Sequence, residues 1–208
     1  MTRLAFLALL GATTFQGKPP LPAPDAEGWI SLFNGKDLTG WEGDAKVWRV
    51  ENGAISGRVD KIGYNTFLVY AHPFSDFVLE AKFILPKGGN SGIQYRSVVT
   101  DPARWVVGGY QADIGAGWYG ALYEERGRGV LIKADPEVAK TVKADDWNQY
   151  EIRAEGSKLR HTLNGKVSGE IDDKGDKARA EGILALQYHA PGNFEIRFKD
   201  IRIKPLAK

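Results

Sequence analysis

The sequence predicts an all-β protein folded as an antiparallel sandwich of two sheets. After residue 29, short apolar segments follow one another at roughly 8–12-residue intervals, and Gly, Asn and Asp residues separate them. Several segments alternate apolar and polar side chains, which is the two-residue period of a strand. Helical periodicity is scarce, because only residues 135–141 could form a turn or two, with Pro136 at a first helical position. Together these features favour a sandwich over folds with layers of helices.

A series of strands is expected in the first half of the chain. They lie at residues 47–50, 54–57, 65–70, 77–85, 90–96 and 109–114. Asn52-Gly53 separates the first two, and this dipeptide is a strong signal for a tight hairpin turn. In the segment 77–85 every second residue is apolar over the whole length, which predicts a strand face turned to the core.

The second half continues in the same style. Strands are expected at residues 147–154, 158–163, 166–171, 182–189 and 194–203. Asn164-Gly165 predicts another hairpin turn. In the last strand the apolar alternation shifts its phase near Lys199-Asp200, which predicts a β-bulge. No repeat and no second composition regime is visible after Pro24, so we expect a single domain at 28–206.

Composition and charge exclude several function classes. The chain has 208 residues, 43% of them hydrophobic, which is enough for one substantial core. Its formal net charge is only +2, which gives no electrostatic reason to expect nucleic acid as a partner. Cys is absent, and His72, His161 and His189 show no metal-ligand spacing, so we expect no metal and no cofactor. Calcium held by Asp or backbone oxygens stays open, and His161, between Leu159 and Leu163, is expected on a strand face.

The first residues have the pattern of a secretion signal. Arg3 precedes a short apolar run at 4–12, which is too short to span a bilayer. We therefore expect a signal peptide at 1–16 and a Pro-rich linker at 17–27, with a buried N-terminal helix as the alternative. This interpretation predicts a periplasmic or secreted protein without a membrane span, and we expect it to be a monomer.

Three of the expected strands each carry two polar side chains that lie two residues apart. The pairs are Gln94 with Arg96, Gln111 with Asp113, and Gln187 with His189. Side chains at positions i and i+2 share one face of a sheet. Amides, a guanidinium, a carboxylate and an imidazole on one face predict a site for a polar ligand. The alternative is a solvated outer face, because alternation alone places a polar residue at every second position.

Carboxylates near the central pair suggest acid–base chemistry. A retaining glycosidase on this kind of sandwich commonly carries Glu-x-Asp-x-x-Glu on one strand, but Gln111 stands at the first position and no Glu follows at the required spacing. Hydrolysis by two carboxylates of this strand is therefore not expected. Asp113 remains, with Glu124 and Glu125 further along and Arg128 close enough in sequence to keep those acids ionised. Alternatively, this charged segment is only a solvated turn.

Aromatic residues flank the same strand. They are Trp105, Trp118, Tyr119 and Tyr123. A pyranose offers an apolar C–H face to an aromatic ring and hydroxyl groups to planar amides and Arg. Trp118 follows Gly117 in a Gly-rich loop and is the best candidate for exposure, whereas structural roles are expected for Trp29, Trp41, Trp48 and Trp147.

The ordered set of short motifs along the chain resembles the 3-keto-disaccharide hydrolase domain family. The motifs lie at 32–41, 50–55, 77–80, 90–96, 109–114, 147–152, 163–165 and 198–204. The similarity runs from about Gly28 to Pro205, which is essentially the whole chain after the linker. It implies a concanavalin A-like jelly-roll sandwich and a hydrolase, a glycosidase that acts on 3-keto-glycosides and 3-keto-disaccharides.

The shared face of the polar pairs, the flanking aromatic residues and the resemblance together predict the site residues. Substrate binding falls to Asn90, Gln94, Arg96, Gln111, Trp118, Tyr123, Arg128 and Gln187. His189 is the expected base, and Asp113 or Glu125 its orienter or the acid. Many relatives have Glu around position 111, so binding suits Gln111 better than catalysis.

The substrate's chemistry explains why such a set would suffice. A ketone at C3 acidifies the C2 proton, so a base can remove it, the C1 substituent leaves by elimination, and water adds back. No redox cofactor is needed for this route. The alternatives are a non-catalytic carbohydrate-binding, lectin-like module and a cell-surface interaction domain without a sugar ligand. The last leaves the three polar pairs unexplained.

Overall fold

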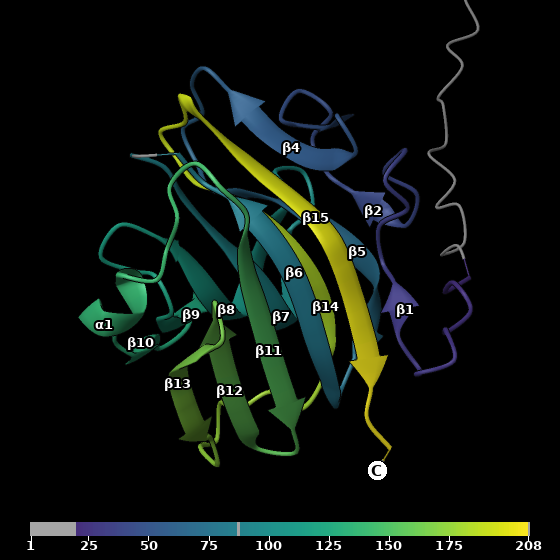
Figure 1. Ribbon diagram of the computed structural model, residues 1–208, viewed down its shortest axis with the longest axis vertical. Coiled ribbons are helices and arrows are strands. Elements are labelled where there is room, and N and C mark those ends of the chain that lie inside the picture. The colour runs from purple at the N-terminus through teal and green to yellow at the C-terminus, as the bar shows by residue number, and fades with distance from the viewer. Residues whose placement is uncertain (1–19, 87, 208) are drawn as a thin grey trace, which may run out of the picture.

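Two antiparallel sheets lie face to face in the structure, a computed structural model that describes residues 20–86 and 88–207 (Figure 1). The strand order of the first sheet is β13 (Lys166–Asp172), β12 (Lys158–Leu163), β11 (Asn148–Glu155), β6 (Phe77–Ile84), β15 (Phe194–Pro205), β4 (Ala54–Val59) and β3 (Trp48–Glu51), with β1 (Ile30–Ser31) also paired to β15. The order of the second sheet is β10 (Gly129–Ile132), β9 (Leu122–Glu125), β8 (Val106–Gly115), β7 (Asn90–Asp101), β14 (Gly182–Tyr188), β5 (Thr66–Phe74) and β2 (Trp41–Glu42). The predicted antiparallel sandwich is confirmed.

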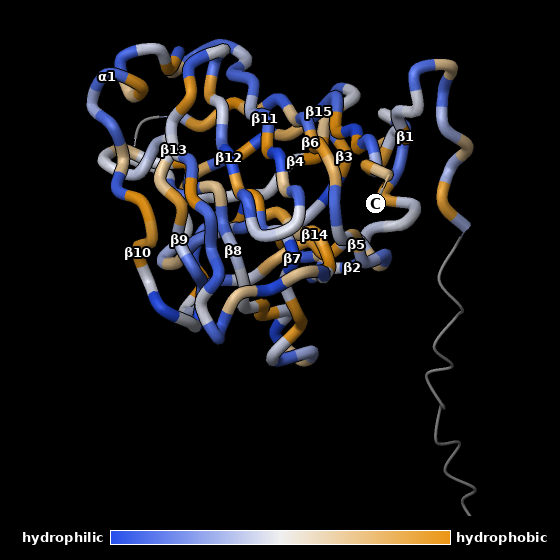
Figure 2. The backbone as a smooth tube through the Cα atoms, turned by 90° about the horizontal axis from the view of Figure 1, so that it is seen from below, coloured by the Kyte–Doolittle hydropathy of each residue, from blue (hydrophilic) through white to orange (hydrophobic). Residues whose placement is uncertain are grey.

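The core lies between the sheets and is built from every second residue of the long strands. Along β6, buried residues alternate strictly with half-buried ones, as the sequence predicts. From the second sheet, Tyr95, Tyr110, Leu186 and Tyr188 enter this core. Figure 2 shows hydrophobic and hydrophilic positions succeeding one another along the strands of both sheets. The polar partners of these residues on β7, β8 and β14 must therefore face away from the core.

The middle of the second sheet is buried on both of its faces. All ten residues of β8 are buried, including those that face outward. Part of the outer face carries a small second hydrophobic cluster of Phe67, Val69, Val106, Val107 and Ala185. The outward polar residues of β8 therefore lie in a hollow and not on an open surface.

The turn signals are confirmed. Asn52 and Gly53 have positive φ angles of 50° and 71° and join β3 to β4, while Asn164 and Gly165, at 49° and 78°, join β12 to β13. Positive φ at both central positions is the geometry that Asn-Gly favours. The register of β15 with β6 shifts between Lys199 and Arg202, which confirms the bulge.

The helix α1 (Pro136–Ala139) begins where Pro136 predicts it. Asp135 caps it by accepting a hydrogen bond from the Glu137 backbone N–H at 2.8 Å. His161 lies on a strand, as expected, and is wholly buried in the core with its Nε2 2.9 Å from the Tyr95 hydroxyl. Burial lowers its pKa to about 3, so His161 is neutral.

The predicted signal peptide at 1–16 lies outside the described residues. Of the predicted linker, residues 20–27 are described, and each of them is exposed. No helix in the described part of the chain is both long and apolar enough to cross a membrane.

Candidate functional site

A pocket of 370 Å³ opens on the outer face of the second sheet. Its volume falls in the range of small-molecule sites. Most of the side chains that line it come from β7, β8, β9 and β14 or from the loops at their ends: Asn65, Asn90, Gln111, Asp113, Trp118, Tyr123, Glu125, Gln187 and His189. The structure thus brings together eight of the eleven residues predicted for the site and adds Asn65.

Strand alternation places the central pair in this pocket. Gln111 and Asp113 face outward because Tyr110, Ala112 and Ile114 face the core. Both side chains are nevertheless almost fully buried, at 2% and 4% exposure. Such groups keep little water around them, so their hydrogen bonds and charges act strongly on one another.

A chain of amides fixes the carboxyl group of Asp113. Gln111 donates from Nε2 to Asp113 Oδ1 at 2.6 Å, and Gln94 donates from Nε2 to Gln111 Oε1 at 2.7 Å. Gly92 lies opposite Asp113 on β7 and leaves room for Gln111, because a Cβ atom there would lie 2.6 Å from the Gln111 side chain. Gln94 itself lies behind Gln111 and does not line the pocket, so its predicted contact with substrate is replaced by this indirect one.

Burial makes Asp113 an acid for neutral pH. It raises the pKa of Asp113 to about 7, although the Gln111 hydrogen bond lowers it, and the nearby charge of Glu125 raises it further. Burial also raises the pKa of Glu125, against which the charges of His189 and Arg126 and a hydrogen bond from Asn65 act. A carboxyl group that titrates near neutrality inside a pocket is typical of an acid–base site.

The ring of His189 is oriented by the backbone. Its Nδ1 contacts the carbonyl oxygen of Ala190, and because a carbonyl can only accept, Nδ1 carries the proton. In the neutral ring Nε2 then carries the lone pair, which is what a base requires. Asn65 supports the same turn by accepting from the Ala190 backbone N–H at 3.1 Å.

Gln187 is an unpaired polar group in the pocket. It is 1% exposed, and neither its Nε2 nor its Oε1 has a hydrogen-bond partner within the described residues. A buried unpaired amide costs about 1–3 kcal/mol. A ligand with hydroxyl or carbonyl groups would provide the missing partners.

Two aromatic rings form a corner at the mouth of the pocket. Trp118 is 39% exposed, as its place in a Gly-rich loop predicts, and it meets Tyr123 edge to face, with centroids 6.2 Å apart and planes at 89°. The backbone N–H of Trp118 donates to the Gly115 carbonyl at 2.9 Å, which holds the turn after β8. Trp105 packs on the small hydrophobic cluster instead and does not line the pocket.

The prediction that Arg96 shares this face is wrong. The register of β7 with β8 shifts between Tyr95 and Val98, and Arg96 has a positive φ of 44°, so the alternation breaks one residue after Tyr95. Its guanidinium is buried at the end of the sandwich. There it donates to Ser75 O at 2.8 Å, Gly156 O at 2.7 Å, Arg179 O at 3.1 Å and Asp76 Oδ1 at 2.9 Å.

Arg128 also lies away from the pocket, contrary to its predicted role in binding. It contacts Glu124 and forms a bidentate pair with Asp173, at 3.0 and 2.6 Å. Glu124 is 3% exposed, so this charged segment is not merely a solvated turn. On β9, Glu124 faces inward to Arg128, and Glu125 faces the pocket.

Asn65 is the lining residue that sequence reasoning missed. It directly precedes β5, whose Thr66 pairs with Tyr188, and this pairing sets Asn65 beside His189. The sequence of one strand does not reveal its partner, so no pattern around Asn65 could have shown this. Within the described residues, no three His, Asp or Glu side chains are grouped so that they could hold a metal ion.

Comparison with known proteins supplies the context for this site. A protein named 3-keto-disaccharide hydrolase from Bacteroides thetaiotaomicron is 40% identical over 81 residues, which cover 34% of this chain and only 28% of that protein. The crystal structure of a candidate glycosyl hydrolase from Parabacteroides distasonis superimposes with a TM-score of 0.66 at 23% identity, over 88% of this chain and 95% of that one. A carbohydrate-binding module from Bacillus subtilis superimposes with a TM-score of 0.59 at 17% identity, over 78% and 94%.

The structural likenesses, at these identities, show a shared fold and agree with a concanavalin A-like sandwich. The family-level finding extends further along the sequence. A sequence model described as the 3-keto-alpha-glucoside-1,2-lyase-like domain matches residues 28–204, which confirms the resemblance read from the motifs. This chain therefore belongs to the family of the 3-keto-alpha-glucoside-1,2-lyase-like domain.

Proposed function

We propose that this protein is a periplasmic or secreted enzyme that cleaves 3-keto-glycosides, including 3-keto-disaccharides, by elimination followed by hydration. The observation that carries the proposal is the pairing, in one pocket, of a buried carboxyl group whose pKa is raised to about 7 with an imidazole whose Nδ1 is held by a backbone carbonyl. An elimination needs one group that accepts a proton and one that donates it, and both must be poised near neutral pH. The family description and the name of the Bacteroides relative support the substrate class.

The reaction can be written with the residues of the pocket. His189 Nε2 removes the proton from C2, and the electron pair moves into the C3 carbonyl to give an enolate. The enolate re-forms the ketone as the C1–O bond breaks, and Asp113 gives its proton to the departing oxygen. Water then adds to C1, returning a proton to Asp113, while His189 returns the other proton to C2. The sum is hydrolysis, and both residues end in their starting states.

Other lining residues support the charges that develop. Glu125 lies close enough to His189 for their charges to interact, and this interaction lowers the pKa of Glu125 against the effect of burial. Among the residues that line the pocket there is neither Lys nor Arg, so the enolate oxygen depends on amide donors. Gln187 Nε2, which has no partner in the described structure, and the amide of Asn90 are available for this role.

The aromatic corner suits the apolar face of a sugar ring. Trp118 and Tyr123 present two perpendicular ring planes at the mouth of the pocket. A ring that packs its C–H groups on one of them would direct its hydroxyl groups toward Gln111 and Gln187.

A non-catalytic carbohydrate-binding module is the second candidate function. The unpaired amide of Gln187 and the aromatic corner favour it, since both serve binding and neither requires an acid or a base. The two functions differ in whether Asp113 and His189 change the rate of a reaction.

The test uses purified protein, a 3-keto-glucoside and the matching unoxidised glucoside. We expect release of the alcohol from the 3-keto substrate, and we expect His189→Ala to lower turnover by roughly 10²–10⁴-fold while binding persists. Protein that binds glycans but never turns over the 3-keto substrate would establish the module instead. Full activity of His189→Ala would move the base to Asp113 or Glu125.

The remaining proposals concern export and assembly. We propose that residues 1–16 are removed on export, that 17–27 form a linker and that 28–206 form a monomeric domain. Mass spectrometry of protein recovered from the periplasm or medium should show a start after residue 16, and an intact Met1 would refute the export proposal. Light scattering of the purified protein measures its oligomeric state.

A further inference from the structure

A directional hydrogen-bond chain runs behind the pocket. Ser97 Oγ lies 2.7 Å from Gln94 Oε1 and 3.0 Å from the Tyr95 carbonyl oxygen, and the shorter contact is the one to Gln94. Gln94 donates from Nε2 to Gln111 Oε1 at 2.7 Å, and Gln111 donates from Nε2 to Asp113 Oδ1 at 2.6 Å. All four side chains are at most 4% exposed. Of these residues, Ser97 and Gln94 do not line the pocket.

The chain cannot easily reverse one member at a time. In each Gln the oxygen accepts from the residue before it and the nitrogen donates to the residue after it. Turning the Gln111 amide over would set nitrogen against nitrogen toward Gln94 and oxygen against oxygen toward Asp113, and turning the Gln94 amide over would set its oxygen against that of Gln111. In a buried place, each lost bond leaves groups unpaired, which is costly.

Two glycines leave room for the side chains of this hydrogen-bond chain. A Cβ atom at Gly109 would lie 2.3 Å from Ser97 Oγ, and one at Gly92 would lie 2.6 Å from the Gln111 side chain. The bulge after Tyr95 sets the start of the chain, because it brings Ser97 within reach of Gln94 on the same strand. Backbone and side chains thus agree on one arrangement.

The arrangement distinguishes the two oxygens of Asp113. In this orientation of the amides Oδ1 faces the N–H group of Gln111, so a proton on Oδ1 would point at another proton. The neutral carboxyl group then carries its proton on Oδ2. After that proton has left, the N–H of Gln111 stabilises the carboxylate.

We propose that Gln94 and Ser97 are positioning residues for Asp113: they orient the Gln111 amide so that Asp113 exchanges a single proton, through Oδ2. The proposal rests on the proposed function, because it gives Asp113 the part of the acid. It gives a positioning role to two residues that contact neither the substrate nor the reacting atoms.

The experiment measures the titration of Asp113 directly. The carboxyl carbon of Asp113 is followed by NMR in the full-length protein without substrate and is assigned by its absence in Asp113→Asn. Wild-type Asp113 should titrate near pH 7. Gln94→Met keeps the length of the side chain and removes its donor, so the Gln111 amide is no longer held and the midpoint should rise by about one pH unit.

Two further variants make the result specific. Ser97→Ala removes one oxygen from the far end of the chain, and we expect a smaller rise in the same direction. Gln187→Met makes the same substitution in the same pocket but outside the chain, and it should leave the midpoint within a few tenths of a pH unit. Amide NMR spectra of each variant show whether the fold is retained.

An Asp113 midpoint that stays in place in both folded variants, Gln94→Met and Ser97→Ala, would overturn the proposal, as would an equal shift in Gln187→Met. The titration needs no substrate, so a protein inactive on 3-keto-glucosides would refute the proposed function without touching this result. In an active protein, the limb of the pH–turnover profile that reports the acid should move with the NMR midpoint. If the NMR midpoint moves and the pH–turnover profile does not, Gln94 and Ser97 position Asp113, but Asp113 is not the acid of the reaction.

Discussion

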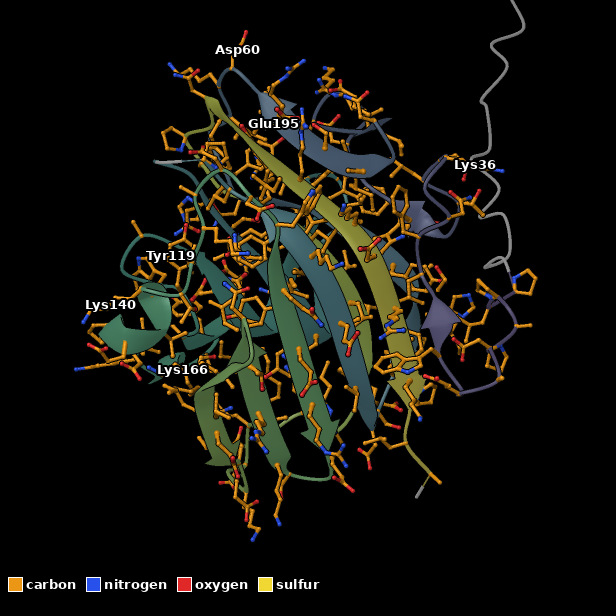
Figure 3. The ribbon with its side chains drawn as sticks, in the orientation of Figure 1. Lys36, Asp60, Tyr119, Lys140, Lys166 and Glu195 are labelled. Carbon is orange, nitrogen blue, oxygen red and sulfur yellow. The ribbon has the colours of Figure 1, made fainter. Side chains whose placement is uncertain are left out.

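The outer faces of the two sheets use polar side chains in opposite ways. The larger recess of the two, at 560 Å³, lies on the first sheet over β6, β11 and β15. There the charges are paired, with Arg202 2.7 Å from Glu80 and Lys82 2.9 Å from Asp200, and most of these side chains are well exposed. Further along β15, Glu195, labelled in Figure 3, likewise accepts from Ser56 at 2.8 Å.

The outer face of the second sheet holds the smaller pocket and the polar side chains whose burial costs more free energy. Gln111, Asp113 and Gln187 are almost fully buried there, and Gln187 has no partner among the described residues. An exposed ion pair contributes about 0–1 kcal/mol, whereas a buried unpaired polar group costs about 1–3 kcal/mol. If the smaller pocket is the site, as proposed above, the size of a recess is a poor guide to function. Polar groups that are dehydrated without full compensation are a better one.

The largest expected effect is on the free energy of unfolding, and it tests whether Arg96 belongs to the outer face of either sheet. Asp76→Ala removes the only carboxylate bonded to the Arg96 guanidinium in the described structure, and Arg96 is 1% exposed. We expect a loss of roughly 3–5 kcal/mol in the free energy of unfolding, because a buried charge is left uncompensated. Urea denaturation measures this loss, while the affinity of the folded variant for sugar should stay as in the wild type.

Asp200→Ala is the matched control for this prediction. It removes the partner of an exposed Lys82 and should cost less than about 1 kcal/mol. If Asp76→Ala instead leaves stability intact and abolishes sugar binding, Arg96 acts at the site after all, and the distinction drawn between the faces fails.

Arg96 also shows where prediction from the sequence ends. The alternation of apolar and polar residues predicted the sandwich, the Asn-Gly hairpins and the outward face of Gln111, Asp113 and Gln187, because a strand's period is a local property. A bulge shifts that period by one residue, and nothing in Tyr95-Arg96-Ser97 announces one. The bulge in β15 was predictable because apolar residues resume on its far side in the new phase.

The rest of the site depends on which strands pair. Asn65 joins the pocket through the pairing of β5 with β14, and Arg128 leaves it for Asp173 in the loop after β13. Burial is equally non-local: Gln111 reads as a surface residue of a strand and is 2% exposed in the structure. The free-energy cost of burying Gln111, and the raised pKa of its neighbour Asp113, arise only once the sheets have assembled.

The next prediction concerns how much the burial of Asp113 lowers the free energy of unfolding. In the folded protein burial raises the pKa of Asp113 from 3.8 to about 7. Between these values the folded protein holds a proton that the unfolded chain has released, so its free energy of unfolding falls as the pH rises through this window. Asp113→Asn removes the ionisation and still accepts from Gln111, and each pKa unit corresponds to about 1.4 kcal/mol. The variant should therefore exceed the wild type by on the order of 4 kcal/mol at pH 8 and match it near pH 4.

Urea denaturation across pH 4–8 measures that difference, and turnover of a 3-keto-glucoside should fall in the same variant. Asp200→Asn, on the exposed outer face of the first sheet, should leave the pH dependence of stability as it is in the wild type. Equal pH profiles of wild type and Asp113→Asn would show that Asp113 is ionised in the folded protein, and the contrast between the two faces would lose its main support.

A smaller effect is expected at the unpaired amide. Gln187→Met preserves volume and removes two buried groups that have no partner within the described residues, so the free energy of unfolding should rise by about 1 kcal/mol. The affinity for a sugar ligand should fall by about tenfold, the effect of one lost hydrogen bond. Thermal unfolding and calorimetry measure the two quantities. Gln149→Met, at an exposed position of the larger recess, should change neither, and a rise in affinity in Gln187→Met would contradict the assignment.

The smallest effect is expected from the larger recess itself. Lys82→Gln removes a pair whose side chains are 40% and 54% exposed, and the free energy of unfolding should change by less than about 0.5 kcal/mol. The change should shrink further in high salt, because ions screen exposed charges. Affinity for sugar should not change, since every charge that Lys82 and Arg202 meet in this recess is already balanced by a neighbour. Calorimetry with the same ligand decides the matter: a loss of affinity in Lys82→Gln would mean that the paired charges open to receive a sugar, and that an exposed, satisfied surface can bind as well as a buried, unsatisfied one.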